Sequence, residues 1–183
     1  GRNMSTLKVS TISPLGTDST KTITIGDITN GDVAAGAFAN TPAFMAAKTA
    51  TQTISLNSNT KVTFDSEVLD TDSAFSDSKF TVPTGKAGKY SIKIDGAFEN
   101  SADYSQVWIM LYKNGSLGDV EQRIRMTTNY FQGASSQRLS ASGLLSLSAG
   151  DYLEVYGYIN AGSGTPQFNL NTFNFSGHRV IGA

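Results

Sequence analysis

The stretch Lys79–Asn100, KFTVPTGKAGKYSIKIDGAFEN, decides the fold class of this chain of 183 residues. Phe80 and Val82 alternate with polar neighbours before a break that contains proline and glycine. Alternation then resumes with apolar side chains on one face, at Tyr90, Ile92, Ile94 and Phe98. Because successive side chains of a strand point to opposite sides, the pattern predicts two strands joined by a turn, each with one buried face. Such strands are typical of a β-sandwich or a β-barrel.

Short segments of this kind continue through the rest of the chain after residue 50. The predicted strands are 51–56, 60–69, 79–82, 88–100, 105–113, 122–126, 137–147, 152–159 and 167–181. Gly143 is expected to mark a bulge, and Ala43–Ala46 is expected to be extended after an alanine-rich linker. Many short strands with Gly, Asn and Pro turns and no helical periodicity predict an all-β antiparallel sandwich.

The N-terminal part is expected to form a separate region. We interpret residues 1–3 as a tag remnant, 4–41 as an attachment or trimerisation segment with a linker, and 42–183 as the head domain. Two short predicted strands, 6–12 and 21–29, are too small to bury a core of their own. They therefore need copies from other subunits or a larger particle as partners.

Composition excludes several classes of function. The formal net charge is −1 and no basic block is present, so nothing indicates binding to nucleic acid or to an anionic membrane. The absence of cysteine excludes a disulfide scaffold, a thiolate metal site and a cysteine nucleophile. No apolar run approaches the ~20 residues of a membrane span, so membrane insertion is not expected.

Several short motifs follow one another in a characteristic order within residues 42–183. They are Ala43–Ala46, Val62–Asp65, Phe80–Pro83, Gly88–Tyr90, Ser142–Leu147, Ala149–Asp151 and Thr172–Gly177. This order resembles the globular head of complement C1q, a relative of the tumour necrosis factor (TNF) jelly roll. The resemblance implies a ten-stranded jelly-roll β-sandwich that assembles as a homotrimer and binds partners rather than catalysing. The chain departs from vertebrate members in lacking cysteines and a collagen-like stalk, which argues against an immune role.

The N-terminal stretch 4–27, MSTLKVSTISPLGTDSTKTITIGD, resembles the beginnings of structural and tail-fibre proteins of bacteriophages. The two resemblances together suggest a virion protein whose trimeric head binds a host surface glycan or protein and whose N-terminal segment binds other virion proteins. The alternative is a purely structural virion protein, such as a capsid decoration or tail adaptor. Burial of the first strand and of the Phe173/Phe175 strand against neighbouring subunits is expected to make the trimer obligate.

No catalytic or metal-binding signature accompanies these features. His178 is the only histidine, and it follows Ser176 without the G-x-S-x-G pattern of a nucleophile elbow. Five carboxylates cluster in a Ser/Asp-rich connection, which we interpret as a solvated loop rather than a glycosidase site: Asp65, Glu67, Asp70, Asp72 and Asp77. No cofactor is expected, although calcium near the trimer axis is an alternative that the family resemblance leaves open. An enzymatic depolymerase ranks behind both binding hypotheses.

The most informative candidate site is aromatic. On strands 105–113 and 152–159, aliphatic residues share one face and aromatic residues the other. The family resemblance makes these strands neighbours in the sheet that faces away from the trimer axis. The receptor-binding candidates are Trp108, Tyr112, Tyr152, Tyr156 and Tyr158. Two alternatives stay open: these rings are covered by another part of the assembly, or the site lies in the tip loops 129–136 and 161–166.

Overall fold

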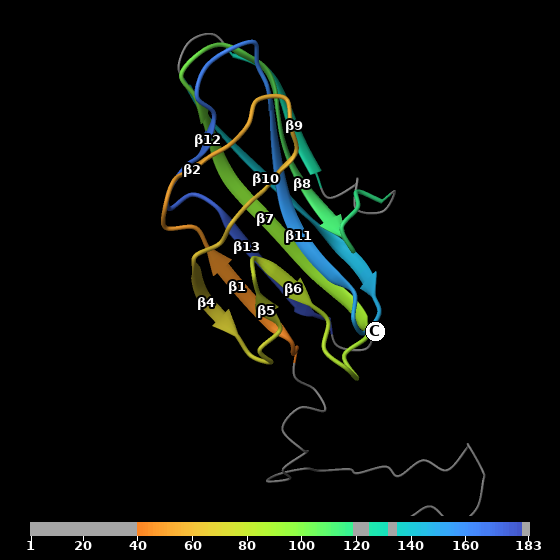
Figure 1. The fold of residues 1–183 in the computed structure, drawn as a ribbon. Coiled ribbons are helices and arrows are strands. Elements are labelled where there is room, and N and C mark those ends of the chain that lie inside the picture. Colours follow the sequence, from red (N-terminus) through yellow and green to blue (C-terminus); the bar gives the residue numbers. More distant parts are fainter. Residues whose placement is uncertain (1–39, 119–124, 132–134, 181–183) are drawn as a thin grey trace, which may run out of the picture. The chain divides into compact units, whose positions relative to one another are not determined.

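The computed structural model describes residues 40–118, 125–131 and 135–180, and the side chains of 119–135 are outside this description. Within these residues the chain forms thirteen strands and no helix, so no described helix is available to span a membrane. The all-β prediction is confirmed (Figure 1). The strands are β1 (Ala43–Ala47), β2 (Gln52–Thr53), β3 (Thr60–Lys61), β4 (Ser66–Asp70), β5 (Phe75–Ser76), β6 (Lys79–Thr81), β7 (Gly88–Asn100), β8 (Tyr104–Lys113), β9 (Arg125–Phe131), β10 (Ser135–Leu147), β11 (Tyr152–Asn160), β12 (Gln167–Phe168) and β13 (Asn174–Arg179).

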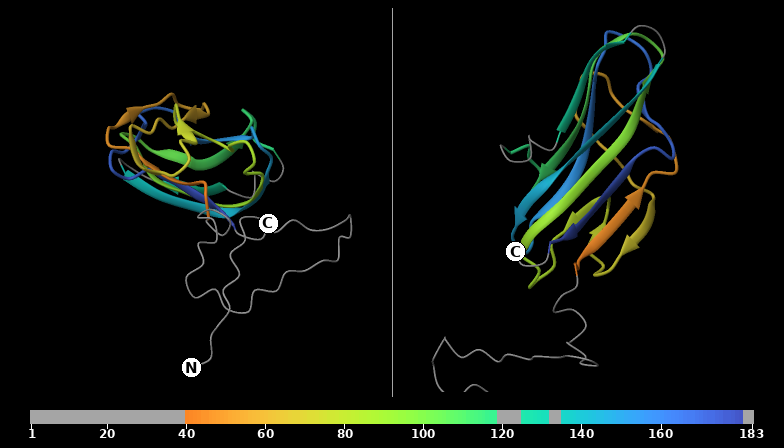
Figure 2. Two further views of the ribbon diagram at one scale, coloured as in Figure 1. Left: turned by 90° about the horizontal axis from the view of Figure 1, so that it is seen from below. Right: turned by 180° about the vertical axis from the view of Figure 1, so that it is seen from behind.

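The strands form two antiparallel sheets that pack face to face (Figure 2). The seven-stranded sheet has the order β2-β12-β7-β13-β1-β4, and β10 pairs with β7 along its whole length. The six-stranded sheet has the order β5-β6-β11-β8-β9, and β3 also pairs with β11. Both sheets therefore combine strands that lie far apart in the sequence, as in a jelly roll.

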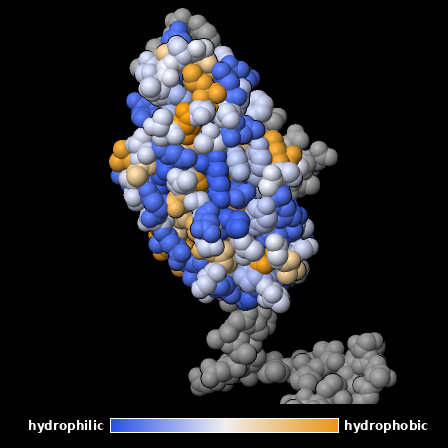
Figure 3. All heavy atoms as spheres, in the orientation of Figure 1, coloured by the Kyte–Doolittle hydropathy of each residue, from blue (hydrophilic) through white to orange (hydrophobic). Residues whose placement is uncertain are grey.

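The core lies between the sheets and is built by the alternation that the sequence shows. Inward side chains of β7 meet inward side chains of β8 and β11, and buried phenylalanines pack in two groups of rings. The rings of Phe44 and Phe80 stack with centroids 4.2 Å apart, and Phe175 meets Phe44 edge-on at 4.9 Å. Each fully buried Phe contributes about 1.5–3 kcal/mol through the apolar area that it removes from water. On the face drawn in Figure 3, hydrophobic residues form only small separate spots among hydrophilic ones.

One glycine on β11 shows how tightly the sheets pack. A Cβ atom on Gly157 would lie 2.5 Å from a ring carbon of Phe168 and 2.6 Å from one of Phe98. Both rings are fully buried, so they have no open space into which to move. Glycine at this position lets β11 approach the opposite sheet closely, which fixes the spacing beneath the outward-facing aromatic residues.

The strongest strand predictions are confirmed, and two others are wrong. Strand β7 matches the predicted range 88–100, and β11 matches 152–159 to within one residue. The predicted strand 60–69 is instead divided between β3 and β4, which lie in different sheets. Val62 is fully buried, but Val68 is 58% exposed because the chain changes sheet between them. The predicted strand 167–181 is likewise divided into β12 and β13 by a turn, since Asn171 adopts a positive φ of 55°.

Two finer predictions also need correction, and one falls on residues that the structure does not describe. Gly143 pairs with Ile92 in a regular register, so no bulge lies there; the irregular register lies between β1 and β4. The predicted tip loop 129–136 is mostly strand, because β9 continues to Phe131 and β10 begins at Ser135. The strands predicted at 6–12 and 21–29 lie outside the described residues.

One part of the predicted reason for an obligate trimer, burial of the Phe173/Phe175 strand against neighbouring subunits, is wrong as well. Phe173 and Phe175 are 1% and 0% exposed within a single chain, where they pack in its own core. Strand β13 lies between β7 and β1 rather than at a sheet edge. Of the described side chains of this sheet, only the outward-facing ones are therefore available for contact with another copy.

Candidate functional site

Strands β8 and β11 are neighbours, so the structure brings the five sequence-predicted aromatic residues together. In this pairing Tyr158 lies opposite Trp108, and Tyr156 lies opposite Met110. Alternation directs the aliphatic residues of both strands into the core, which leaves the aromatic residues on the outer side. All five are half-buried. We call this surface the aromatic face: Trp108, Tyr112, Tyr152, Tyr156 and Tyr158.

The rings of the aromatic face pack against one another. Tyr112 and Tyr156 stack with centroids 4.0 Å apart and an interplanar angle of 28°. Trp108 and Tyr158 lie 5.8 Å apart at 51°. Met110 lies between these pairs in the strand register and is fully buried, although it is outside the main core cluster. The rings therefore help to cover Met110 on the outer side of the sheet, and this packing occupies part of their ring surface.

Strand β3 supplies charge beside the rings, because it pairs with the middle of β11. Lys61 Nζ lies 2.6 Å from Glu154 Oε1 and donates to the main-chain oxygen of Asp77 at 2.9 Å. Gln52 holds β3 in place: its amide nitrogen donates to Lys61 O at 2.9 Å, and its amide oxygen accepts from Thr63 N at 3.0 Å. The side-chain amide thus donates and accepts one hydrogen bond each, as a main-chain peptide group of a neighbouring strand would. Glu154 is absent from the sequence-predicted candidates, although its side chain points to the same side of β11 as Tyr152 and Tyr156.

Further polar contacts hold the Tyr112 hydroxyl and the Tyr152 ring. Asn59 Nδ2 donates to the Tyr112 hydroxyl at 2.8 Å, and Lys79 Nζ lies 5.0 Å from the centre of the Tyr152 ring. Burial raises the pKa of the Tyr156 phenol, and the Glu154 carboxylate adds to this effect. The phenol is therefore neutral at physiological pH. The face can offer hydroxyl groups and ring edges to a ligand.

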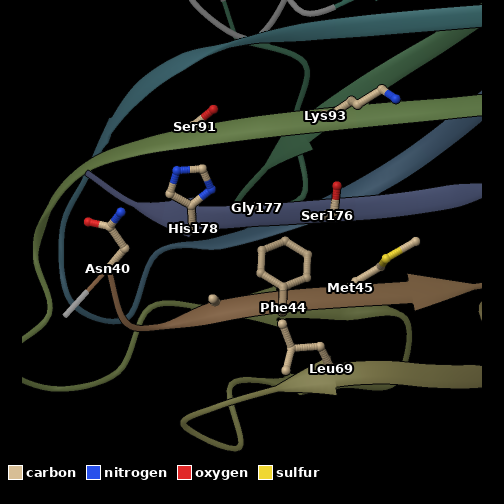
Figure 4. A pocket seen from close by; sticks show the side chains of 10 residues that line it. Asn40, Phe44, Met45, Leu69, Ser91, Lys93, Ser176, Gly177 and His178 are labelled. Atoms are coloured by element: carbon tan, nitrogen blue, oxygen red, sulfur yellow. The ribbon is translucent and has the colours of Figure 1, made fainter. Parts of the chain in front are cut away.

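The opposite surface of the molecule has a different character. Rows of side chains, many of them small or polar, cross four or five strands of the seven-stranded sheet, as Figure 4 shows for its β7, β13, β1 and β4 side chains. One row is Leu144, Ser91, His178 and Ala43, and the next is Ser142, Lys93, Ser176, Met45 and Leu69. These rows border an open hollow of about 600 Å³. We call this surface the small-residue face.

The residues considered for catalysis are not arranged for it. His178 is exposed on the small-residue face beside Ser91 and Ser176, and the hollow there has no carboxylate in its lining. Among the carboxylates, Asp65 accepts from the Thr49 amide at 2.6 Å, and Asp70 accepts from the Phe75 amide at 2.8 Å. The hydrogen bond from Thr49 lowers the pKa of the Asp65 carboxyl group. In the parts of the chain that the structure describes, no three His, Asp or Glu side chains are grouped as metal ligands.

The tip loop at 161–166 is a loop, as predicted, and its backbone is tied down. Asn100 Nδ2 donates to Ala102 O and to Ser163 O, both at 3.0 Å. A Cβ atom on Gly164, whose φ is +106°, would lie 2.3 Å from Asn100 Oδ1. The buried Asn100 side chain thus fixes the loop from below.

Comparison with known proteins places this geometry in a family. The C1q domain model matches residues 43–180, which include both sheets and the aromatic face. This chain belongs to the C1q domain family. Domains of the C1q and TNF families are non-enzymatic binding modules that typically assemble as homotrimers and bind receptors.

Solved structures show the same fold at low sequence identity. The globular domain of zebrafish complement 1qA is 16% identical, with a TM-score of 0.51 over 76% of this chain and 98% of that one. Murine APRIL is 12% identical, with a TM-score of 0.50 over 75% of this chain and 98% of that one. No curated protein matches the chain. The C1q/TNF-like jelly roll inferred from the sequence is thereby confirmed.

Proposed function

We propose that this C1q domain is the head of a non-enzymatic phage tail-fibre-like virion protein that binds a host surface receptor, a glycan or a protein. The observation that carries the proposal is the aromatic face, five half-buried rings gathered on the outer side of one sheet. Tyrosine and tryptophan combine an apolar ring with a polar tip, which suits contact with sugars and proteins. The phage context is supported by the resemblance of residues 4–27 to the starts of phage structural proteins.

The head acts as a homotrimer that assembles through the small-residue face. Small side chains such as Ser91, Ser176 and Ala43 allow another copy to approach the sheet closely. Leu144 and Leu69, which are 67% and 48% exposed, flank these rows and would lose water contact in the assembly. Because the aromatic face belongs to the other sheet, assembly leaves it outward on all three copies.

Three outward faces on one rigid particle give multivalent adhesion. Each face needs only modest affinity, because binding of the first copy raises the effective concentration of the others at the cell surface. The N-terminal segment, residues 4–41, attaches the head to other virion components.

The test is staining of the host bacterium with the fluorescently labelled protein. Wild type should bind cells and compete with infection, whereas Trp108→Ala and Tyr156→Ala should reduce staining by at least about tenfold, the loss expected of an interface aromatic. Leu170→Ala, at a residue 50% exposed on a turn, serves as the matched control and should stain as wild type does. Thermal melts establish that each variant is folded. Unchanged staining by both aromatic variants would reject the aromatic face as the receptor site.

A second candidate, a purely structural virion role, is favoured by one specific observation. The Tyr112–Tyr156 stack and the fully buried Met110 give the rings a packing role that needs no ligand. A capsid decoration or tail adaptor would bind purified virion components and leave host cells unstained, so the same labelled protein separates the two functions.

A further inference from the structure

The sandwich is open along the side where both sheets end. Strand β4 is the last strand beyond β1 in one sheet, and β5 is the last strand beyond β6 in the other. The two short strands lie near each other at the lower end of the molecule (Figure 1). Within the described residues, no strand pairs with the outer edge of β4. Main-chain groups along such an edge are a template for another extended segment.

A hollow of about 420 Å³ lies between these two edges. Its apolar lining comes from Phe64 and Phe75, whose rings meet edge-on with centroids 6.2 Å apart. Its polar lining includes three carboxylates, at Asp65, Glu67 and Asp77. Aromatic carbon beside carboxylate oxygen fits a side chain with an apolar stem and a cationic head, which is to say lysine or arginine.

Acidic side chains outnumber basic ones in this region, although the buried Lys48 interacts electrostatically with Asp65. Residues 62–78 contain five acidic side chains and no lysine or arginine. Three of the five are engaged, because Asp65 and Asp70 accept backbone hydrogen bonds and Asp72 pairs with Lys86 at 3.4 Å. Glu67 and Asp77 are exposed, and among the described residues their carboxylates have no hydrogen bond or ion pair. Lys61 lies near Asp77 but is committed to its main-chain oxygen and to Glu154.

The shape of β4 restricts what can pair with it. The register between β1 and β4 shifts so that Met45 pairs with Leu69 and Ala46 with Glu67, which leaves Val68 as the extra residue of a bulge. Val68 is 58% exposed. A bulge and acidic side chains disfavour pairing with a second copy of the same edge, where like charges would meet. An incoming strand with basic side chains would meet opposite charges instead.

We propose that this acidic edge, formed by β4 and the hollow between β4 and β5, docks an extended segment of a partner polypeptide that carries lysine or arginine. The main chain of that segment pairs with the outer edge of β4, as in recognition by β-strand addition. One basic side chain enters the hollow, with its stem on Phe64 and Phe75 and its head between Glu67 and Asp77. A neighbouring apolar side chain covers Val68. The proposal is independent of the receptor proposal, because the acidic edge and the aromatic face share no residue.

The test uses two synthetic peptides that alternate valine with either lysine or glutamate, added to the full chain. Hydrogen exchange should show that the lysine peptide protects the Ser66–Asp70 amides and that the glutamate peptide does not. Binding of the lysine peptide should weaken as salt rises, since exposed charge pairs are screened. The double variant Glu67→Lys/Asp77→Lys should bind it about tenfold more weakly or worse, because attraction is replaced by repulsion.

The control Glu99→Lys changes a carboxylate on β7, an interior strand of the same sheet, and should alter the affinity less than twofold. Tyr156→Ala should also leave peptide binding unchanged, which separates this result from any failure of the receptor proposal. Equal binding of the glutamate peptide, protection of another sheet edge such as β10, or undiminished binding by the double variant would each overturn the inference.

Discussion

The two outward surfaces of this sandwich are both built from strands with alternating side chains, yet they differ in how well their side chains cover one another. On the aromatic face, rings stack on rings, Glu154 pairs with Lys61, and Met110 is fully buried beneath its neighbours. On the small-residue face, many side chains are short, a hollow stays open, and Leu69 and Leu144 are 48% and 67% exposed. A surface whose apolar groups are covered by its own side chains is stable in water. A surface with exposed apolar groups is stabilised when a partner buries them. This contrast supports our proposal that the small-residue face serves assembly and the aromatic face serves recognition.

The largest effect is expected from a charge placed at the centre of the small-residue face. Ser176→Arg puts a long cation beside Lys93, between strands that another copy must approach closely. Burying that charge without a partner costs several kcal/mol per copy, so the trimer should dissociate into folded monomers. Analytical ultracentrifugation measures the change, and Leu170→Arg should leave the trimer intact. A trimeric Ser176→Arg protein would move the assembly surface elsewhere.

Two methionines, one on each face, test the same contrast through smaller changes in the free energy of unfolding. Met110→Ala removes a fully buried side chain and should lower the free energy of unfolding by about 2–4 kcal/mol. Met45→Ala, at a half-buried position, should cost less than about 1 kcal/mol when both are measured in the monomeric Ser176→Arg background. Urea denaturation gives both values. Equal costs would show that the two faces are equally complete and would remove the contrast.

How far the sequence predicted these faces depends on whether the strand keeps one register. In β7, β8 and β11 no register shift interrupts the pairing, so residues such as Ile92, Val107 and Val155 could be assigned to the core from parity alone. The same rule failed between Val62 and Val68, because the chain leaves one sheet for the other and then bulges. Sequence parity does not predict which side chains are buried once the chain has changed sheet or formed a bulge.

The candidate site shows a second limit. Parity correctly placed the five rings on the outer side of neighbouring strands, and the pairing of β8 with β11 came from the family resemblance. It also placed Met110 outward, but whether an outward side chain is exposed depends on its neighbours across the sheet. Lys61 and Asn59 could not be anticipated either, since they reach the face from β3 and the residue before it, 93 residues before Glu154 and 53 residues before Tyr112.

The ion pair on the aromatic face should contribute less than the buried methionine. Glu154→Gln removes the charge that Lys61 faces at 2.6 Å, although Lys61 keeps its hydrogen bond to Asp77. The pair is partly exposed, so the loss of stability should be about 1 kcal/mol. A double-mutant cycle with Lys61→Met measures the coupling, which should be near 0.5–1 kcal/mol at low salt. A coupling of zero would mean that the pair orders the face without stabilising it.

The smallest effect is expected in the alkaline range and involves Tyr156. Its pKa is raised in the folded protein, first by burial and then by Glu154, so folding favours the neutral phenol. The resulting stabilisation is fully present below the unfolded pKa near 10 and is lost as pH rises through the folded value. Tyr90, in the core of β7, behaves likewise, since burial raises its pKa to about 12.

Wild type should therefore lose stability between about pH 10 and 12, and Tyr90→Phe should remove more of that loss than Tyr156→Phe does. Denaturation curves recorded across this range measure the three slopes, and a lower baseline stability of either variant does not affect the comparison. If Tyr156→Phe reduced the pH dependence of stability as much as Tyr90→Phe does, the Tyr156 hydroxyl would be as shielded from water as the core. Its rings would then be closed to a ligand, and the structural virion role would become the better reading of this surface.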